Sequence, residues 1–248
     1  MIVEKENRIG DLVTKNFQSA RVFEEFGLDY CCGGKKSINQ ACKDKGIDEN
    51  LVIEKLSRLE EDNSSSSHYG DWDAGFLADY IVNNHHRYIR KNIPSIENHL
   101  QKVISAHGER NPEVVKVGEQ FKIMKDDLLM HMSKEEKMLF PYIHKLYLAK
   151  NNSQVISVPP FGKVQNPIKV MEEEHQQAGD DMAKISKLTN NYTPPNNSCG
   201  TFRVLYSELK DFEKDLHVHV HLENNILFPK AMELEYSVMK IDQDSCSM

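Results

Sequence analysis

The chain has 248 residues, a net charge of −7 at pH 7, 39% hydrophobic residues and 28% charged residues. This length is enough for one large domain or two smaller ones, each with a buried core. No window approaches the run of about eighteen apolar residues that a membrane span needs, and the first residues lack the apolar segment of an export signal. The acidic balance, without a long basic run, argues against nucleic-acid binding.

The cysteines indicate a reducing compartment. Their number is odd and their spacing is irregular, so we expect free thiols and a cytoplasmic protein rather than a disulfide framework. The five positions are Cys31, Cys32, Cys42, Cys199 and Cys246.

Residues 1–60 predict a small helical domain. Asp11 is placed to begin a helix that Gly27 ends, and Ser37 and Asp48 are placed to begin two more. Such a unit is small for an independent core, which leaves open that it packs on the rest of the chain or on a second subunit in a homodimer. The Ser-rich segment 61–72 predicts a linker.

Residues 73–240 contain four long helical patterns and no strand alternation. We expect helices over about 74–106, 112–150, 167–188 and 201–236, with the first one kinked or broken at Pro94. Helices of this length with short or moderate connections predict an antiparallel four-helix bundle, so the fold class is all-α.

A short motif occurs twice in this region. His131 is followed four residues later by Glu135 and then by Leu139-Phe140-Pro141, and His219 is followed in the same way by Glu223 and Leu227-Phe228-Pro229. Residues four apart lie on one face of a helix, one turn above the other. Each copy therefore offers an imidazole and a carboxylate to the same point.

Helical periodicity separates the histidines that face the core from the others. Both motif pairs fall on apolar seams, and His175 falls on the seam of helix 167–188. The seam predicted for helix 112–150 comprises Val114, Val117, Phe121, Met124, Leu128, His131, Glu135, Met138 and Tyr142.

Other histidines are harder to place. His217 and His221 share a face with charged residues, so we expect them to lie mainly outside the site or in solvent. In helix 74–106 the series through His86 is apolar and the series through His85 is polar, so His86 is preferred and His85 remains the alternative.

The inward-facing polar groups predict a metal site. Burying two carboxylates without partners costs several kcal/mol each, and a bound cation removes that cost. Cysteine is absent from the set, which argues against a structural zinc–thiolate site, and the set exceeds the needs of one tetrahedral zinc. It suits two octahedral ions bridged by both carboxylates, with an oxo or hydroxo bridge or an open position. Iron is favoured, with manganese or zinc as substitutes. The predicted ligands are His86, His131, Glu135, His175, His219 and Glu223.

These motifs resemble a known pair of domains. The two His-x-x-x-Glu repeats, with single histidines from two further helices, resemble a hemerythrin-like (HHE) domain. The run Asp29-Tyr30-Cys31-Cys32-Gly33-Gly34, followed by Ala41-Cys42 and Gly46-Ile47-Asp48, resembles the module that precedes this domain in the repair-of-iron-centres family. The resemblance implies a cytoplasmic di-iron protein that helps restore iron–sulfur clusters damaged by nitric oxide or peroxide. The family's ligand pattern falls on the same six residues.

The adjacent thiols of Cys31 and Cys32 need a separate interpretation. Neighbouring cysteines rarely bridge to each other, whereas two thiols beside two glycines can present thiolates to a metal, to nitric oxide or to a partner's disulfide. We take these two cysteines as the candidate reactive residues. The alternative is that they are small buried core residues.

Two functions follow from the sequence. The first is repair of proteins with damaged iron–sulfur clusters, by supplying iron, by reacting with nitric oxide, or both. The alternative is a hemerythrin-like module that binds or senses oxygen or nitric oxide without repair. Reduction of nitric oxide at the metal centre would make the protein an enzyme, and the sequence leaves this open.

Overall fold

The structure is a computed structural model that describes residues 3–59, 68–152, 154, 156–196 and 198–245. Within these ranges the secondary structure is helical, apart from an isolated bridge between Arg8 and Ser37. The predicted all-α fold, a helical bundle preceded by a small helical part, is confirmed. Among the described helices, none combines the length and the apolar character that crossing a membrane requires.

Backbone contacts divide the chain into two compact units. One contains Met1–Ala78, Ile143–Gln165 and Val218–Met248, and the other contains Asp79–Tyr142 and Asn166–His217. The predicted linker, residues 61–72, falls mainly on residues 61–67, which lie outside the described ranges. The predicted domain boundaries therefore stay a prediction.

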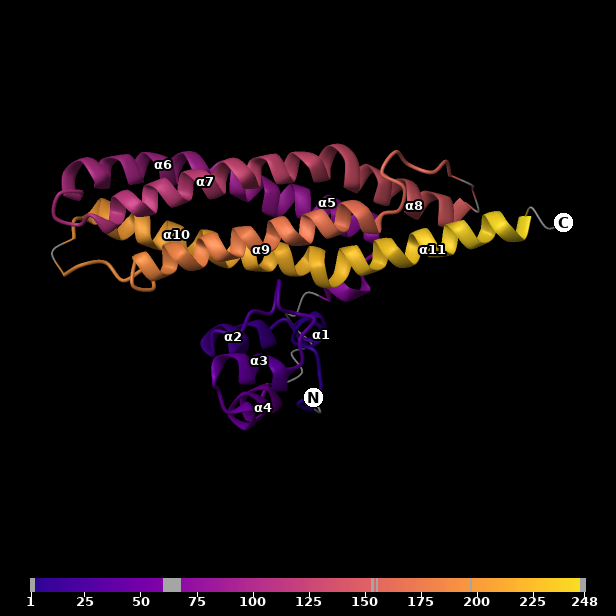
Figure 1. Cartoon of the computed structure of the whole chain (residues 1–248), viewed down its shortest axis with the longest axis horizontal. Coiled ribbons are helices and arrows are strands. Elements are labelled where there is room, and N and C mark those ends of the chain that lie inside the picture. The colour runs from indigo at the N-terminus through magenta and orange to yellow at the C-terminus, as the bar shows by residue number, and fades with distance from the viewer. Residues whose placement is uncertain (1–2, 60–67, 153, 155, 197, 246–248) are drawn as a thin grey trace. The chain divides into compact units, whose positions relative to one another are not determined.

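The second unit is built from the long helices α6 (Arg87–His107), α7 (Glu113–Lys134), nearly all of α9 (Gln165–Leu188), and α10 (Gly200–Leu222) as far as His217. They run side by side in Figure 1. Phe121 of α7 meets Phe212 of α10 edge to face, with ring centroids 5.7 Å apart. Glu208 of α10 accepts a hydrogen bond from Ser95 of α6. These contacts join both α7 and α6 to α10.

The first unit includes the four short helices near the N-terminus: α1 (Ile9–Lys15), α2 (Ser19–Glu25), α3 (Ile38–Lys45) and α4 (Glu49–Ser57). The predicted starts of two of them are confirmed, because Ser37 accepts from the amide of Gln40 and Asp48 accepts from that of Asn50. The single helix expected from Asp11 to Gly27 is two helices, and the first begins at Ile9, so the predicted start at Asp11 is wrong. Asn16 separates them, with its side chain accepting a hydrogen bond from the amide of Gln18.

The same unit also contains the 3-10 turn η1 (Tyr69–Asp71), most of α8 (Phe140–Asn152) and all of α11 (Phe228–Ser245). Lys230 of α11 donates to the carbonyl of Trp72 at 2.7 Å. Buried Glu235 accepts from the amide of Val164 at 2.8 Å, just before α9 begins. These side chains fix α11 to two loops.

Three π-helical turns interrupt the long helices: η2 (Val82–His86) after α5 (Ala74–Ile81), η3 (Glu135–Leu139) and η4 (Glu223–Leu227). Each π-turn adds a residue and so rotates the helix that follows. Met138 is consequently 39% exposed, and Leu139 is buried in its place, so the predicted seam position of Met138 is wrong. A kink or a break was predicted at Pro94; the break is wrong, because α6 runs through this residue, and the kink stays a prediction.

The aromatic contact in the second unit gives a test of its core. Phe212→Ala removes a fully buried ring, and we expect it to lower the free energy of unfolding by about 3–5 kcal/mol. Val204→Ala on the same helix is the control, because Val204 is 47% exposed and should change stability by less than about 0.5 kcal/mol. Urea unfolding followed by circular dichroism measures both, and equal effects would contradict this packing.

Candidate metal centre

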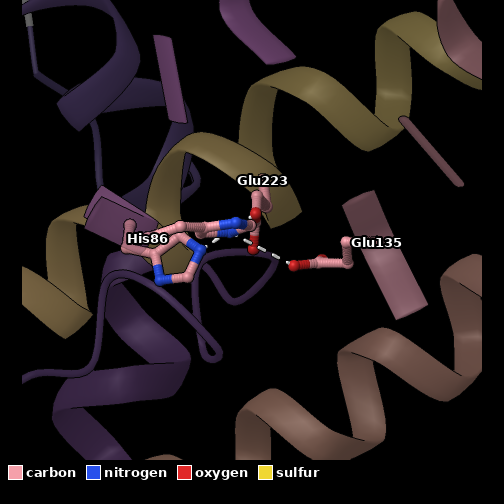
Figure 2. Close-up of side chains that lie close together, drawn as sticks. His86, Glu135 and Glu223 are labelled. Atoms are coloured by element: carbon pink, nitrogen blue, oxygen red, sulfur yellow. Dashed lines mark hydrogen bonds and ion pairs between the residues drawn. The ribbon is translucent and has the colours of Figure 1, made fainter. Parts of the chain in front are cut away.

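Six buried side chains form two overlapping clusters. Each is at most 3% exposed, and within each cluster the potential ligand atoms all lie within 4.8 Å of one another. Figure 2 shows three of them, from separate helical segments, converging. One cluster is His86, Glu135, His219 and Glu223, and the other is His131, Glu135, His175 and Glu223. The two glutamates belong to both clusters, and each cluster has two imidazoles of its own.

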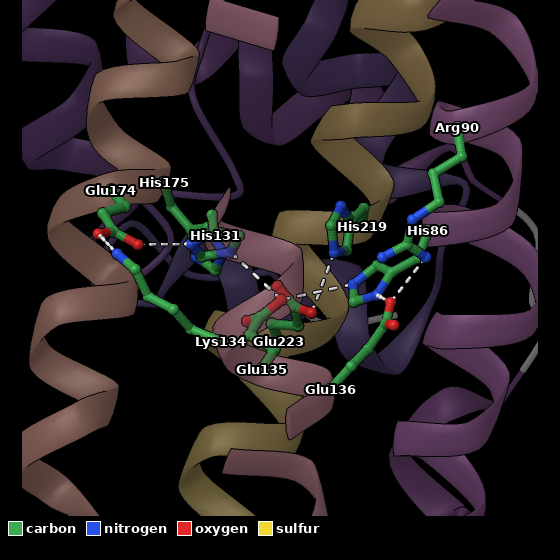
Figure 3. A network of polar contacts seen from close by, with 10 residues as sticks. All are labelled: His86, Arg90, His131, Lys134, Glu135, Glu136, Glu174, His175, His219 and Glu223. Atoms are coloured by element: carbon green, nitrogen blue, oxygen red, sulfur yellow. Dashed lines mark hydrogen bonds and ion pairs between the residues drawn. The ribbon is translucent and has the colours of Figure 1, made fainter. Parts of the chain in front are cut away.

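Three of the imidazoles, those of His86, His131 and His219, meet the shared carboxylates through their Nε2 atoms, as Figure 3 shows. Glu135 Oε2 lies 3.4 Å from His86 Nε2 and 3.3 Å from His131 Nε2. Within the second motif, His219 Nε2 lies 3.0 Å from Glu223 Oε1. The Nε2 atoms of His131 and His175 are 2.9 Å apart. The lone-pair positions of several rings are therefore gathered in one small region.

An outer carboxylate fixes the ring of His86. Its Nδ1 lies 2.7 Å from Glu136 Oε1, which also pairs with Arg90 at 2.8 Å. Partial burial raises the pKa of Glu136, but hydrogen bonds from Arg90 and His86 outweigh it and bring the pKa below its usual value. Glu136 is therefore charged at neutral pH, and it favours the His86 tautomer with the proton on Nδ1 and a free lone pair on Nε2.

His131 is held in the same way on the other side. Its Nδ1 lies 2.9 Å from Glu174 Oε2, and Lys134 pairs with the other oxygen of this carboxylate. The hydrogen bond from His131 lowers the pKa of Glu174 to about 2, against the opposing effect of burial and with support from Lys134. A carboxylate behind a ligating imidazole is the usual second layer of a protein metal site.

The donor set fits a metal centre. Glu135 and Glu223 are fully buried and close together, so their negative charges would repel each other without a cation. The imidazoles around them present Nε2, and two of these rings have their Nδ1 atoms held by outer carboxylates. Nitrogen and carboxylate ligands in a helical bundle suit redox-active divalent ions such as iron.

The structure places His86 in a cluster and His85 outside both. His85 is also buried, but its Nδ1 pairs with Asp215 Oδ1 at 3.0 Å. The placement of His86 agrees with the preference drawn from its apolar series. Its role as a ligand stays a prediction.

We expected His221 to lie mainly outside the site or in solvent. The second expectation is wrong, because His221 does not reach solvent. It is fully buried, and burial lowers its pKa to about 4, so the ring is neutral at physiological pH. It belongs to neither cluster, and its Nδ1 lies 3.1 Å from the side-chain nitrogen of Asn225. His217 is half-buried.

A cavity of about 260 Å³ adjoins one side of the two side-chain clusters. His131 and His175 line it, together with the charged pair Lys134 and Glu174. Its remaining wall is mixed, with Met124, Asp127, Leu128, Met130, Gln177, Ala178 and Asp181. The cavity is large enough for small molecules or hydrated ions.

The two neighbouring thiols, those of Cys31 and Cys32, lie in a turn organised by Asp29. We call this turn the thiol turn. Its carboxylate accepts backbone hydrogen bonds from Cys31, Cys32 and Gly33 at 2.9–3.0 Å. Cys31 Sγ lies 3.1 Å from Asp29 Oδ1 and 4.0 Å from Cys32 Sγ. The hydrogen bond with Cys32 and burial raise the pKa of Cys31 well above its ordinary value, so this thiol stays protonated.

Comparisons with known proteins agree with both parts of this arrangement. Residues 77–231 match the hemerythrin HHE cation-binding domain, and residues 5–60 match a domain of unknown function, DUF542. The chain is 32% identical to the iron–sulfur cluster repair protein YtfE of Dickeya chrysanthemi over 231 residues, which cover 93% of this chain and 99% of the relative. It is 34% identical to YtfE of Pectobacterium atrosepticum, with the same coverage of each chain.

The chain belongs to the hemerythrin-like iron–sulfur cluster repair family. The family includes ScdA of Staphylococcus haemolyticus, which is 29% identical over 92% of this chain and 99% of its own length. The HHE match contains all six clustered residues, and the DUF542 match contains the thiol turn. The resemblance drawn from the motifs is thereby confirmed.

Sequence reasoning missed the outer residues Arg90, Glu136 and Glu174. Two of them could have been predicted, because Glu136 directly follows one predicted ligand and Glu174 directly precedes another. The signal was the requirement that a ligating imidazole place its second nitrogen on an acceptor. Which carboxylate meets which ring depends on contacts between helices, and the sequence does not give these.

Glu136 provides a test of the outer layer. Glu136→Gln removes the charge that orients His86, and we expect metal affinity to fall about 10–100-fold. Glu119→Gln is the control, because Glu119 is exposed on α7. Competition with a coloured iron chelator measures affinity, and equal retention in the two variants would contradict this role.

The two cysteines should differ in reactivity. Cys31 is 6% exposed and held by Asp29, whereas Cys32 is more exposed, so we expect iodoacetamide to alkylate Cys32 about tenfold faster or more. Peptide mass spectrometry of the native protein measures both rates. Exposed Cys199 and buried Cys42 serve as references for fast and slow alkylation. Faster alkylation of Cys31 than of Cys32 would contradict this prediction.

Proposed function

We propose that this protein holds two iron ions and restores iron–sulfur clusters damaged by nitrosative or oxidative stress. The observation that supports it most directly is the sharing of Glu135 and Glu223 by two clusters, each with its own pair of imidazoles. Two shared carboxylates are the natural bridges between two ions. The names of the relatives, iron–sulfur cluster repair proteins, supply the kind of group that is repaired.

The side chains divide between the two ions. His86 and His219 would hold one ion, His131 and His175 the other, and the two glutamates both. Bound iron would supply redox chemistry with small molecules such as nitric oxide or oxygen, and it would also be available as cargo for a damaged cluster. Iron is favoured over zinc because the set offers more ligands than tetrahedral zinc takes up.

The chain's own residues would control access to this centre. The cavity beside His131 and His175 offers a route, and the Lys134–Glu174 pair lies on its wall. Glu174 also holds the His131 ring. A change in the Lys134–Glu174 ion pair would therefore alter both the cavity wall and the orientation of His131. Because the six clustered side chains are buried, the surrounding protein would keep most bulk water away from ions held there.

The thiol turn favours repair over simple carriage of oxygen or nitric oxide. A carrier needs only the bundle, whereas Cys31 and Cys32 provide sulfur donors that suit iron and iron–sulfur clusters. The partners would then be proteins with damaged iron–sulfur clusters. The free thiols fit a reducing compartment, and we expect the protein to act in the cytoplasm.

Substitution of the shared carboxylates tests this function. Glu135→Gln and Glu223→Gln each remove a bridge, so we expect iron to fall from about two ions per chain and reactivation of a damaged cluster enzyme to be lost. Iron analysis and the recovery of a nitric-oxide-treated iron–sulfur dehydratase are the measurements, with Glu119→Gln as the control. Reactivation at the wild-type rate by iron-depleted variants would show the proposal to be wrong.

A further inference from the structure

The thiol turn is tied to the π-helical turn η4. Asn225 lies on η4, two residues after Glu223. Its side-chain nitrogen donates to the carbonyl oxygens of Tyr30 and Cys31, at 3.2 and 3.1 Å. A carboxamide nitrogen has two hydrogens, so one amide group can satisfy both acceptors. The backbone that carries Cys31 is therefore held by the segment that carries a predicted metal ligand.

Two glycines make room for this amide. A Cβ atom added to Gly34 would lie 2.4 Å from Asn225 Oδ1, and one added to Gly10 would lie 2.5 Å from it. The amide of Gly10 donates to the carbonyl of Gly34 at 2.9 Å, so the two glycines are neighbours in space. Neither adopts a positive φ. The second glycine of the Cys-Cys-Gly-Gly run is thus needed for close approach and not for an unusual backbone conformation.

His221, one helical turn before Asn225, also contacts the thiol turn. It is fully buried, and its Nδ1 lies 3.1 Å from the Asn225 nitrogen. The ring of Tyr30 meets the imidazole edge to face, with centroids 5.7 Å apart. The turn therefore has a ring contact with His221 in addition to the two hydrogen bonds, and Tyr30 covers one side of the imidazole.

We propose that Asn225 is a positioning residue that docks the Cys31–Cys32 turn on η4 and keeps Cys31 inaccessible. Two hydrogen bonds to backbone carbonyls hold the turn. When they are lost, both carbonyls need water as a replacement donor, and this favours release of the turn. Release of the turn exposes Cys31 beside Cys32, which makes the second sulfur available to a metal ion or an electrophile. The proposal concerns access to the thiols and stands whether or not the protein repairs clusters.

The test is the alkylation rate of Cys31 in the full-length, iron-loaded protein. Asn225→Asp keeps the size of the side chain but replaces the donor with an acceptor that faces two carbonyl oxygens. We expect iodoacetamide to label Cys31 about tenfold faster or more, because two ordinary hydrogen bonds shift the docking equilibrium at least that far. Asn83→Asp is the matched control, since Asn83 also lies on a π-helical turn and donates to a backbone carbonyl, that of Asp79.

A second variant approaches the same contact from the other side. Gly34→Ala places a methyl group against Asn225 Oδ1 and should raise the Cys31 rate to a similar degree. Gly200→Ala is its control, because an added Cβ at Gly200 meets nothing within 4 Å. The double variant Asn225→Asp with Gly34→Ala should be no faster than either single one, since both release the same contact.

Cys42 separates release of the turn from unfolding. It is 1% exposed and belongs to α3, so it reacts only if the small helical part opens. Faster labelling of Cys31 with Cys42 protected supports the proposal. Labelling of Cys31 within about twofold of wild type, or a parallel rise at Cys42, would overturn it. Iron analysis of the same samples shows whether the metal centre is retained, and repair activity is not part of the readout.

Discussion

Glu135 and Glu223 impose the main physical constraint on this fold. Both carboxylates are fully buried, and their ligand atoms lie within 4.8 Å of the same imidazoles. Burial of one unpaired carboxylate already costs several kcal/mol, and a second one close by adds repulsion. Cations held between the two glutamates would remove both costs. The rest of the centre can be understood as the arrangement that brings and keeps cations there.

The π-helical turns and the outer charges serve this arrangement. His86 is the last residue of η2, and Glu135 and Glu223 are the first residues of η3 and η4. A π-turn aims a side chain at a point that an unbroken α-helix would miss, and such turns are frequent at functional sites. Glu136 and Glu174 then orient two of the rings from behind. The centre is therefore defined by backbone irregularities and by a second layer of charge as much as by its ligands.

The thiol turn depends on a separate polar network, in which side chains again hold groups in place through hydrogen bonds. Asp29 gathers the backbone amides of the turn, and Asn225 holds its carbonyls. Donors and acceptors of one short loop are thereby satisfied by two side chains, one local and one distant in sequence. The segment η4 carries both Glu223 and Asn225. A short stretch of one helix thus bears a metal-site carboxylate and the anchor of the sulfur-bearing turn.

The sequence alone predicted the helical class, the family and five of the six clustered residues, and it preferred His86 to His85 as the sixth, because motifs and helical periodicity are local regularities. Helical periodicity places His131 with Glu135, and His219 with Glu223, on apolar seams whatever the partner helix is. Tertiary structure decided the rest. The π-turn η3 places Met138 outward and Leu139 inward, and α6 runs on through Pro94; neither follows from helical periodicity or residue propensity. The burial of His221 required a loop from the other end of the sequence, and no periodic pattern records such a contact.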